Sequence, residues 1–276
     1  MATFGIDTSH WQGIYNFEKA KKEGVKYAIL KLGGGDSGIY LDSQFNRSYT
    51  ECKRIGLPVG AYFFGAALTT ADAKKEANYV IDQLKGKQFE YPIFYDVEYA
   101  PMRNLGKTKL TNIVKAFCGE LEKAGYWCGF YTNLDWYRNC LDGAGLAKKY
   151  SFWFAYWADA MYNLPDVQMW QKDAHTIAGV NTDSDYCFVD YPTKIKAKGL
   201  NGFAKTTATT AKRTPKAGDT VKISYGAYYP NGKRIPDRIT SKAWSVRYAG
   251  NGKACVYKSG TEILNAEVEV KYLTIV

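Results

Sequence analysis

Short apolar runs alternate with helix-like stripes through the first 150 residues, and this alternation restricts the possible folds more than any other feature. The apolar runs are rich in β-branched and aromatic residues, which indicates strands. Between them, apolar residues recur every three or four positions, as on one face of a helix. Repeated strand–helix units predict a parallel sheet or barrel. The expected strands are 3–7, 27–32, 58–64, 92–97 and 127–131.

The pattern changes between residues 152 and 188. Three strand-like runs follow one another with little helix between them: FWFAYW (152–157), VQMWQ (167–171) and the stretch around 177–188. About five βα units and three further strands predict an α/β fold, a distorted TIM-like barrel. In such barrels the chemistry lies at the carboxyl ends of the strands. That rule places one group of side chains on a common rim: Asp7, Lys31, Tyr62, Asp96, Glu98 and Tyr131.

The segment FYDVEYA (94–100) places two carboxylates two positions apart in an aromatic run. Residues i and i+2 of a strand face the same side, so Asp96 and Glu98 are predicted to be neighbours. Two unpaired carboxylates side by side retain one proton near neutral pH. Such a pair suits general acid catalysis or a metal site, while a solvated strand edge is the structural alternative.

The composition changes near residue 204, where a stretch almost free of large apolar residues begins. We therefore expect a barrel over 1–203, a linker over 204–217 and a second domain over 218–276. Residues 204–276 carry 13 Lys/Arg and 5 Asp/Glu, so that +8 of the chain's net charge of +10 lies there. A basic tail implies an anionic partner: nucleic acid, a membrane surface or an acidic wall polymer. The linker lacks aromatic residues among its cations, which favours a spacer over a nucleic-acid site.

Several short β-like runs and two turn dipeptides, Asn231-Gly232 and Asn251-Gly252, predict a small β-barrel in the tail. The tail has no constellation of acid, base or nucleophile, so we interpret it as a binding module. Its aromatic residues fit core packing and ligand contact equally well: Tyr225, Tyr228, Tyr229, Trp244 and Tyr248.

The six cysteines are scattered without a C-x-x-C pair, and the chain has two histidines. No zinc-site spacing can be assembled from them, and we predict neither a metal nor a cofactor. Reduced, mostly buried thiols are expected. The N-terminus has no signal-peptide pattern, and the apolar run PVGAYFFGAAL (58–68) is too short to cross a bilayer. We expect a soluble chain, made in the cytoplasm, without membrane insertion.

Three segments carry a resemblance to a known family: FGIDTSHWQG (4–13), FYDVE (94–98) and AGVNTDSDY (178–186). Their order and spacing are those of family 25 glycoside hydrolases, the Chalaropsis-type lysozymes or N-acetylmuramidases. GAYFFG, GFYTN, FWFAYW and MWQ also match in position, so the sequence resembles this family over about residues 3–192. The resemblance implies a barrel of five βα units and three strands. Residues 218–236 are more loosely similar to bacterial SH3-like wall-binding domains.

By position, the resemblance implies that Glu98 is the general acid and that Asp96 assists it. Asp7 and Asp183 would line the same pocket, with Asp185 as an alternative to Asp183. Four further residues would lie at the sugar, the first two at the cleaved bond: Tyr62, Tyr131, Trp157 and Gln171.

The implied reaction is hydrolysis of the β-1,4 bond between N-acetylmuramic acid and N-acetylglucosamine in peptidoglycan. Asp96 shares a strand face with Glu98 and is badly placed to attack from the opposite side of the sugar. It is better placed to hold the substrate's 2-acetamido group, which predicts a substrate-assisted, retaining reaction; direct attack by a carboxylate is the alternative. Two other functions are open: a non-catalytic wall-glycan-binding protein, and a hydrolase of another acetamido polymer such as chitin.

The expected context is that of a phage endolysin, held in the host cytoplasm until lysis and then acting on the bacterial cell wall. Reduced cysteines and the missing export signal favour it over a secreted autolysin. The expected partners are peptidoglycan and, through the basic tail, anionic wall polymers, rather than nucleic acid or a membrane.

Overall fold

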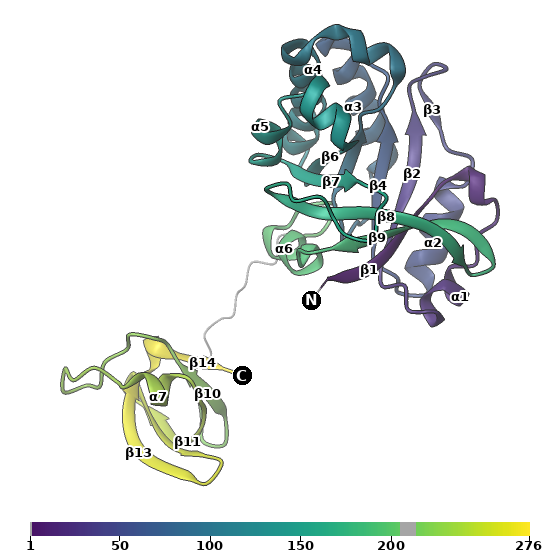
Figure 1. Ribbon diagram of the computed structural model, residues 1–276. Helices are drawn as coiled ribbons and strands as arrows, with labels where there is room; N and C mark the ends of the chain where they lie inside the picture. Colours follow the sequence, from purple (N-terminus) through teal and green to yellow (C-terminus); the bar gives the residue numbers. More distant parts are fainter. Residues whose placement is uncertain (1, 205–213) are drawn as a thin grey trace. The chain divides into compact units, whose positions relative to one another are not determined.

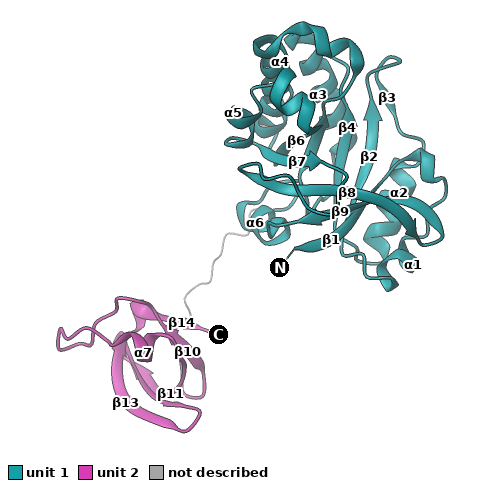
Figure 2. Ribbon diagram, viewed as in Figure 1, with its two compact units in different colours: residues 1–206 teal, residues 207–276 magenta. Residues whose placement is uncertain are grey.

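The computed structural model describes residues 2–204 and 214–276, which form two compact units (Figures 1 and 2). Unit 1 comprises residues 1–206 and unit 2 comprises residues 207–276. Most of the predicted linker, 204–217, lies outside the described residues.

Eight strands of unit 1 close into a barrel, as predicted. Their order is β1-β9-β8-β7-β6-β5-β4-β2, and β2 pairs back to β1. All neighbours are parallel except β9, which runs antiparallel to both β8 and β1. A two-residue strand, β3 (Tyr40–Leu41), extends the sheet beside β2. The barrel strands are β1 (Thr3–Thr8), β2 (Ala28–Gly34), β4 (Val59–Phe64), β5 (Ile93–Asp96), β6 (Cys128–Asn133), β7 (Ser151–Ala155), β8 (Val167–Ile177) and β9 (Val180–Cys187).

Five of the barrel strands are followed by a helix, and the last three come in succession, which confirms the expected five βα units and three strands. The helices are α1 (Phe17–Lys22), α2 (Phe45–Arg54), α3 (Thr70–Leu84), α4 (Lys107–Lys123) and α5 (Gly143–Ala147), with α6 (Tyr191–Lys198) after β9. Three shorter helical turns lie in the loops: η1 (His10–Gln12), η2 (Ala100–Leu105) and η3 (Trp136–Cys140).

Helix α3 shows why these segments fold as the sequence indicates. The Thr69 hydroxyl caps the helix by accepting the backbone N–H of Asp72 at 3.1 Å, which satisfies a donor that the first turn leaves free. The apolar stripe of the helix is buried, at Ala73, Ala77, Val80 and Leu84. Burial of a side chain as large as Val80 or Leu84 contributes about 1.5–3 kcal/mol, so the stripe determines which face of the helix packs on the sheet.

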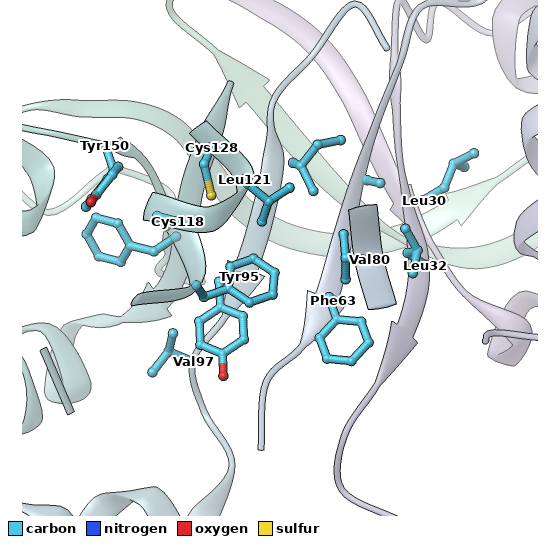
Figure 3. Packing of buried hydrophobic residues seen from close by; sticks show 14 of the residues in the cluster. Leu30, Leu32, Phe63, Val80, Tyr95, Val97, Cys118, Leu121, Cys128 and Tyr150 are labelled. Atoms are coloured by element: carbon cyan, nitrogen blue, oxygen red, sulfur yellow. The ribbon is translucent and has the colours of Figure 1, made fainter. Parts of the chain in front are cut away.

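Successive side chains of each strand face opposite sides of the barrel wall. One set packs under the helices, and Figure 3 shows part of this layer, with Leu30, Phe63 and Tyr95 beside Val80 of α3. The other set fills the barrel interior with large rings such as Tyr27 and Phe94. A Cβ atom at Gly5 would lie 2.3 Å from the Tyr27 ring, so only glycine fits beside that ring.

Helix α6 closes the end of the barrel at which the parallel strands begin. Its Tyr191 and Ile195 belong to the interior cluster, and the Tyr191 ring meets Trp127 edge-on at 5.8 Å between centroids.

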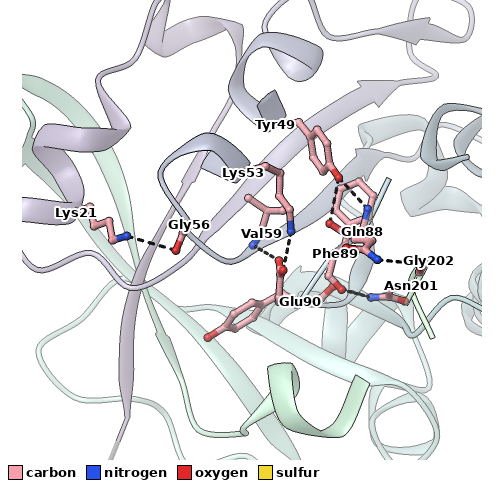
Figure 4. A network of polar contacts seen from close by, with 11 residues as sticks. Lys21, Tyr49, Lys53, Gly56, Val59, Gln88, Phe89, Glu90, Asn201 and Gly202 are labelled. Carbon is pink, nitrogen blue, oxygen red and sulfur yellow. Dashed lines mark hydrogen bonds and ion pairs between the residues drawn. The ribbon is translucent and has the colours of Figure 1, made fainter. Parts of the chain in front are cut away.

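Polar contacts hold the same end together (Figure 4). Glu90 accepts the Lys53 ammonium at 2.6 Å and the Val59 N–H at 3.1 Å. The end at which the parallel strands begin is thus closed by α6 and by these polar contacts. Polar groups collect at the opposite end, on the rim where the parallel strands finish.

Unit 2 is an antiparallel sheet of five strands in the order β13-β12-β11-β10-β14. Asn251 and Gly252, both with positive φ, form the predicted two-residue turn between β11 and β12. Trp244 is fully buried and donates its indole N–H to the Ile239 carbonyl at 2.8 Å, so it belongs to the core. The elements are β10 (Thr220–Ile223), α7 (Asp237–Thr240), β11 (Ala243–Gly250), β12 (Lys253–Ser259), β13 (Glu262–Glu269), η4 (Val270–Tyr272) and β14 (Leu273–Ile275).

Candidate active site

The polar side chains named from the sequence gather where the parallel barrel strands end. Asp7, near the end of β1, is paired across the sheet with Asp183 of β9. Asp96 is the last residue of β5 and is paired with Tyr131 of β6. These positions alternate with the residues that pack under the helices, so their side chains point to the barrel interior.

Gln171 of β8 links several of these groups. Its side-chain oxygen accepts the Tyr131 hydroxyl at 2.9 Å and the Trp157 indole N–H at 3.1 Å. Its amide nitrogen donates to Asp7 Oδ2 at 2.8 Å. These three contacts fix the orientation of the amide, and a residue expected only to lie near the sugar becomes the centre of the hydrogen-bond network.

Asp183 and Asp185 both face the barrel interior, but at different depths. Asp185 is fully buried and accepts the Trp153 indole N–H at 2.8 Å, while Asp183 is half-buried. Burial raises the pKa of Asp183 and, together with the neighbouring Asp7 carboxyl, raises that of Asp185 well above its usual range. Burial and the charge of Asp183 raise the pKa of Asp7 to about 8. The buried Asp7 and Asp185 carboxyls influence each other's pKa, and such a crowded pair retains a proton at neutral pH.

Substitution of Asp7 by asparagine is expected to stabilise unit 1 increasingly as the pH rises. Because the folded-state pKa of about 8 exceeds the ordinary value, the folded chain retains a proton that the unfolded chain loses. Stability of the original protein therefore falls from about pH 4 to pH 8 and then levels off. At pH 8 the variant should gain about 1 kcal/mol or more in the free energy of unfolding, because one pKa unit corresponds to about 1.4 kcal/mol.

Urea unfolding at several pH values measures this effect. Asp159→Asn, which neutralises an exposed carboxylate and keeps Asp7, serves as the control, and its difference in stability from the original protein should not change with pH. A difference between Asp7→Asn and the original protein that stays constant from pH 4 to pH 8 would contradict the assignment.

Asp96 and Glu98 lie together, although not on one strand. The prediction that the strand runs to residue 97 is wrong, because β5 ends at Asp96 and Glu98 belongs to the loop that follows. Burial and the charge of Glu98 raise the pKa of Asp96 well above its usual range, against the effect of Lys31. One Asp96 oxygen, Oδ1, is buried and has no hydrogen-bond partner among the described residues.

Glu98 is exposed, but the protein around its carboxyl displaces hydrating water. This desolvation raises the pKa of Glu98; Lys31 opposes the rise and Asp183 adds to it. Desolvation is therefore the main cause of the raised pKa of Glu98. A carboxyl with a raised pKa that still reaches solvent can deliver a proton to a bound molecule.

An open depression in the surface brings four of the predicted residues together. Its lining includes Glu98, Tyr131, Trp157 and Gln171. Trp157 is 60% exposed, so one face of its ring is free to pack on a ligand. Sequence reasoning missed five further lining residues at the ends of β6 and β7, where the rule about strand ends could have found them: Asn133, Leu134, Asp135, Ala155 and Tyr156.

Tyr62, on β4, and His10, in the loop after β1, also belong to the rim. Tyr62 packs edge-on against the interior Trp153 ring, with 6.0 Å between centroids. Burial is the main cause that raises the pKa of the Tyr62 hydroxyl, and the charges of nearby carboxylates add to the rise. The His10 ring nitrogen Nδ1 lies 2.7 Å from Asp42 Oδ2, which also accepts the His10 backbone N–H at 3.1 Å. His10 therefore holds the loop after β1 to a buried carboxylate.

In the described parts of the chain, no group of three His, Cys, Asp or Glu side chains is arranged to hold a metal ion. Over the same residues, no helix combines the length and apolar character needed to cross a membrane.

Comparison with known proteins identifies relatives of unit 1. The family model described as glycosyl hydrolases family 25 matches residues 6–180. Over 195 residues the chain is 28% identical to Lysozyme M1 of Streptomyces globisporus, an alignment that covers 66% of this chain and 65% of the relative. The matched region thus spans slightly less than two thirds of that relative.

Two solved structures share the fold. The bacterial lysozyme from Streptomyces coelicolor superposes with a TM-score of 0.59 at 24% identity, over 75% of this chain and 99% of that one. The modular autolysin LytC from Streptococcus pneumoniae, in complex with a synthetic peptidoglycan ligand, gives a TM-score of 0.61 at 22% identity, over 68% of this chain and 47% of that one. At these identities the likeness establishes the fold.

Proposed function

The chain belongs to glycosyl hydrolase family 25, and from this membership we propose that it is a lysozyme-type enzyme that hydrolyses the glycan strands of bacterial peptidoglycan. The observation that carries the proposal is the exposed Glu98, with a raised pKa, in a depression lined by Tyr131, Trp157 and Gln171. An acid, an aromatic platform and fixed hydrogen-bonding groups are what cleavage of a glycosidic bond requires.

In the proposed reaction, Glu98 donates its proton to the oxygen that leaves the cleaved bond. The bond is the β-1,4 linkage that follows N-acetylmuramic acid, so each cleavage creates a new muramic acid reducing end. Gln171 holds Tyr131 and Trp157 in fixed orientations against the sugar. The half-buried Asp183, rather than the fully buried Asp185, is the carboxyl of β9 that reaches the substrate.

Asp96 is assigned to the substrate's 2-acetamido group. Its Oδ1 atom has no partner among the described residues, and a buried polar atom of this kind is satisfied when a ligand donates to it. The acetamido N–H is such a donor, and holding it turns the acetamido oxygen toward the anomeric carbon. The acetamido oxygen then acts as nucleophile, which gives net retention of configuration.

Unit 2 is proposed to bind the cell wall as an SH3-like module. Tyr225, Tyr228 and Tyr248 are exposed, unlike Trp244, and the Arg234 guanidinium lies 5.4 Å from the centre of the Tyr225 ring. Exposed rings beside cations, on a segment with a net charge of +8, suit an anionic wall polymer.

The proposed setting is that of a phage endolysin, which is held in the host cytoplasm until lysis and then acts on the wall. All six cysteines are free and buried, as in proteins that fold in a reducing compartment.

The test is to identify the sugar at each new reducing end released from purified, nucleic-acid-free cell walls. Muramic acid ends are expected, and soluble chitin oligomers treated in parallel should stay intact. N-acetylglucosamine ends, or cleavage of chitin at a comparable rate, would redirect the assignment to another acetamido polymer. NMR of the first product anomer, read before mutarotation, should show retention; an inverted anomer would overturn the substrate-assisted route.

A further inference from the structure

A second cavity lies at the end of the barrel at which the parallel strands begin, opposite the rim formed by their carboxyl ends. It has a volume of about 460 Å³ and is bordered by α6, by the end of α4 and by the first residues of β6 and β7. None of the candidate active-site residues lines it. We call it the basic pocket, after its lining residues Lys148, Lys149, Lys194 and Lys198.

The charges around the basic pocket are strongly unbalanced. Among the described residues that line it, Glu122 is the one carboxylate, and it lies 3.9 Å from Lys149. Within the described chain, no carboxylate oxygen lies within 4.0 Å of the ammonium groups of Lys148, Lys194 or Lys198. The lining therefore carries a net charge of about +3, which suits an anionic ligand.

Structural roles in α6 account for these lysines only in part. Lys194 and Lys198 are four residues apart on one helix, where like charges repel and destabilise the helix by about 0.2–0.5 kcal/mol. Lys198 ends the helix and suits its negative end, while Lys194, in the middle of the helix, is attracted by the N-cap carboxylate of Asp190 one turn before it. The repulsion between the two lysines is relieved if an anion binds between them.

Aromatic rings in fixed positions form the wall of the basic pocket. The Trp127 indole N–H and the Tyr191 hydroxyl both donate to Ser151 Oγ, at 3.0 and 2.7 Å. These contacts hold the two rings in place. Two of the cations lie beside rings: the Lys198 ammonium is 4.9 Å from the Trp127 ring, and the Lys149 ammonium is 4.7 Å from the Tyr150 ring.

We propose that the basic pocket binds an anionic carbohydrate. A sugar ring packs on the half-buried Trp127, and the phosphate or carboxylate group of that sugar is held by the lysines, because flat rings and cations side by side match a sugar with an attached anion. The proposal rests on the proposed function for the source of the ligand, since a cell wall supplies both kinds of sugar. It adds a second wall contact at the opposite end of the barrel from the cleavage site.

NMR of the ¹⁵N-labelled full chain tests the proposal through the tryptophan indole signals, with Trp127 assigned from a Trp127→Phe variant. N-acetylglucosamine 6-phosphate and N-acetylmuramic acid are added in separate titrations, and uncharged N-acetylglucosamine in a third. At least one anionic sugar should shift the Trp127 signal with saturation below about 10 mM, whereas the neutral sugar should not. The stronger of the two identifies phosphate or carboxylate as the recognised group.

Matched double variants decide whether the lysines bind the anion. Lys194→Ala with Lys198→Ala should weaken binding by about tenfold or more, a change of about 1.4 kcal/mol. Lys26→Ala with Lys115→Ala removes the same charge from exposed positions outside the pocket and should leave binding unchanged. Equal weakening in both variants, or a response of Trp157 without Trp127, would overturn the proposal.

The proposed function is judged separately from the basic pocket. Release of reducing ends from soluble wall fragments should be the same in the Lys194/Lys198 variant and in the original protein. If no protein releases ends while the Trp127 titration succeeds, the proposed function fails and the binding site stands. If ends are released while no anionic sugar shifts Trp127, the basic pocket is not a sugar site.

Discussion

Glu98→Gln is expected to lower the rate of wall hydrolysis by about 10³-fold, within the range that a general acid contributes. Glutamine keeps the size and hydrogen-bonding shape of the side chain but has no proton to give to the leaving oxygen. Glu98 is exposed in the depression and, among the described residues, has no hydrogen bond or ion pair that the substitution would break. Wall binding and the thermal unfolding midpoint should therefore stay unchanged, and the reducing-end assay reports the loss.

Asp135→Asn is the matched control, because Asp135 lines the same depression and pairs with Arg103 at its margin. Its rate should stay within about threefold of the original, since an exposed ion pair contributes little. If Glu98→Gln hydrolysed walls at the original rate, the acid would be another group. If neither the original nor the variant released reducing ends while both bound walls, a non-catalytic glycan-binding protein would be the better description.

Asn201→Ala is expected to reduce the free energy of unfolding of unit 1 by about 3 kcal/mol, because it leaves buried polar groups without partners. The Asn201 side chain is fully buried and makes three hydrogen bonds. It accepts the Trp127 backbone N–H at 2.6 Å and donates to the carbonyls of Phe89 and Tyr91 at 3.1 and 2.8 Å. Figure 4 shows the contact with Phe89.

The backbone adds to this effect, since Asn201 has a φ of 56°, a conformation that asparagine tolerates better than alanine. The unfolding midpoint should fall by about 8 °C at 2–4 °C per kcal/mol for a unit of this size. Asn163→Ala, at an exposed position, should change it by less than about 1 °C, because exposed substitutions away from special features have small effects. Calorimetry of the full chain measures both, and equal midpoints for the two variants would refute the assigned role.

Much of unit 1 could be predicted because its signals are local. Thr69 and the stripe through Val80 and Leu84 specify a helix from neighbouring residues alone, and the helix lies where the spacing predicts. Apolar runs such as 58–64 are strands for the same reason. The end of β5 was misplaced because the apolar alternation continues through Val97, whereas pairing with β4 and β6 stops at Asp96.

The candidate site could be predicted only in part. Asp7 and Tyr131 follow from the rule that side chains near strand ends meet on the carboxyl rim. Alternation along β9 points both Asp183 and Asp185 to the barrel interior. Which of the two carboxyls reaches the surface of the site depends on how deeply each is buried, and that depends on the packing of the whole barrel. The central place of Gln171 depends on contacts with residues 40 and 164 positions away, which no local pattern contains.

The basic pocket shows the same limit. Lys148 and Lys194 are 46 positions apart in the sequence, on segments that read as ordinary charged surface. Only the closure of the barrel end by α6 brings them to one cavity, and only the structure shows that Trp127 lines that cavity and is held there by Ser151.

The antiparallel insertion of β9 between β8 and β1 has a consequence for the order in which the barrel is completed during synthesis. β1 is synthesised first, and β2 can pair with one of its edges early. The other edge of β1 pairs with β9, so it stays unpaired until residues 180–187 have been made. Until then the edge is exposed and open to wrong pairing. Asp7 meets Asp183 and Asp185 only when β9 closes the barrel, so the costly crowding of carboxyls is postponed until the other seven strands have been made. A nascent chain that stops short of residue 180 would thus have most of the scaffold and an incomplete carboxyl cluster.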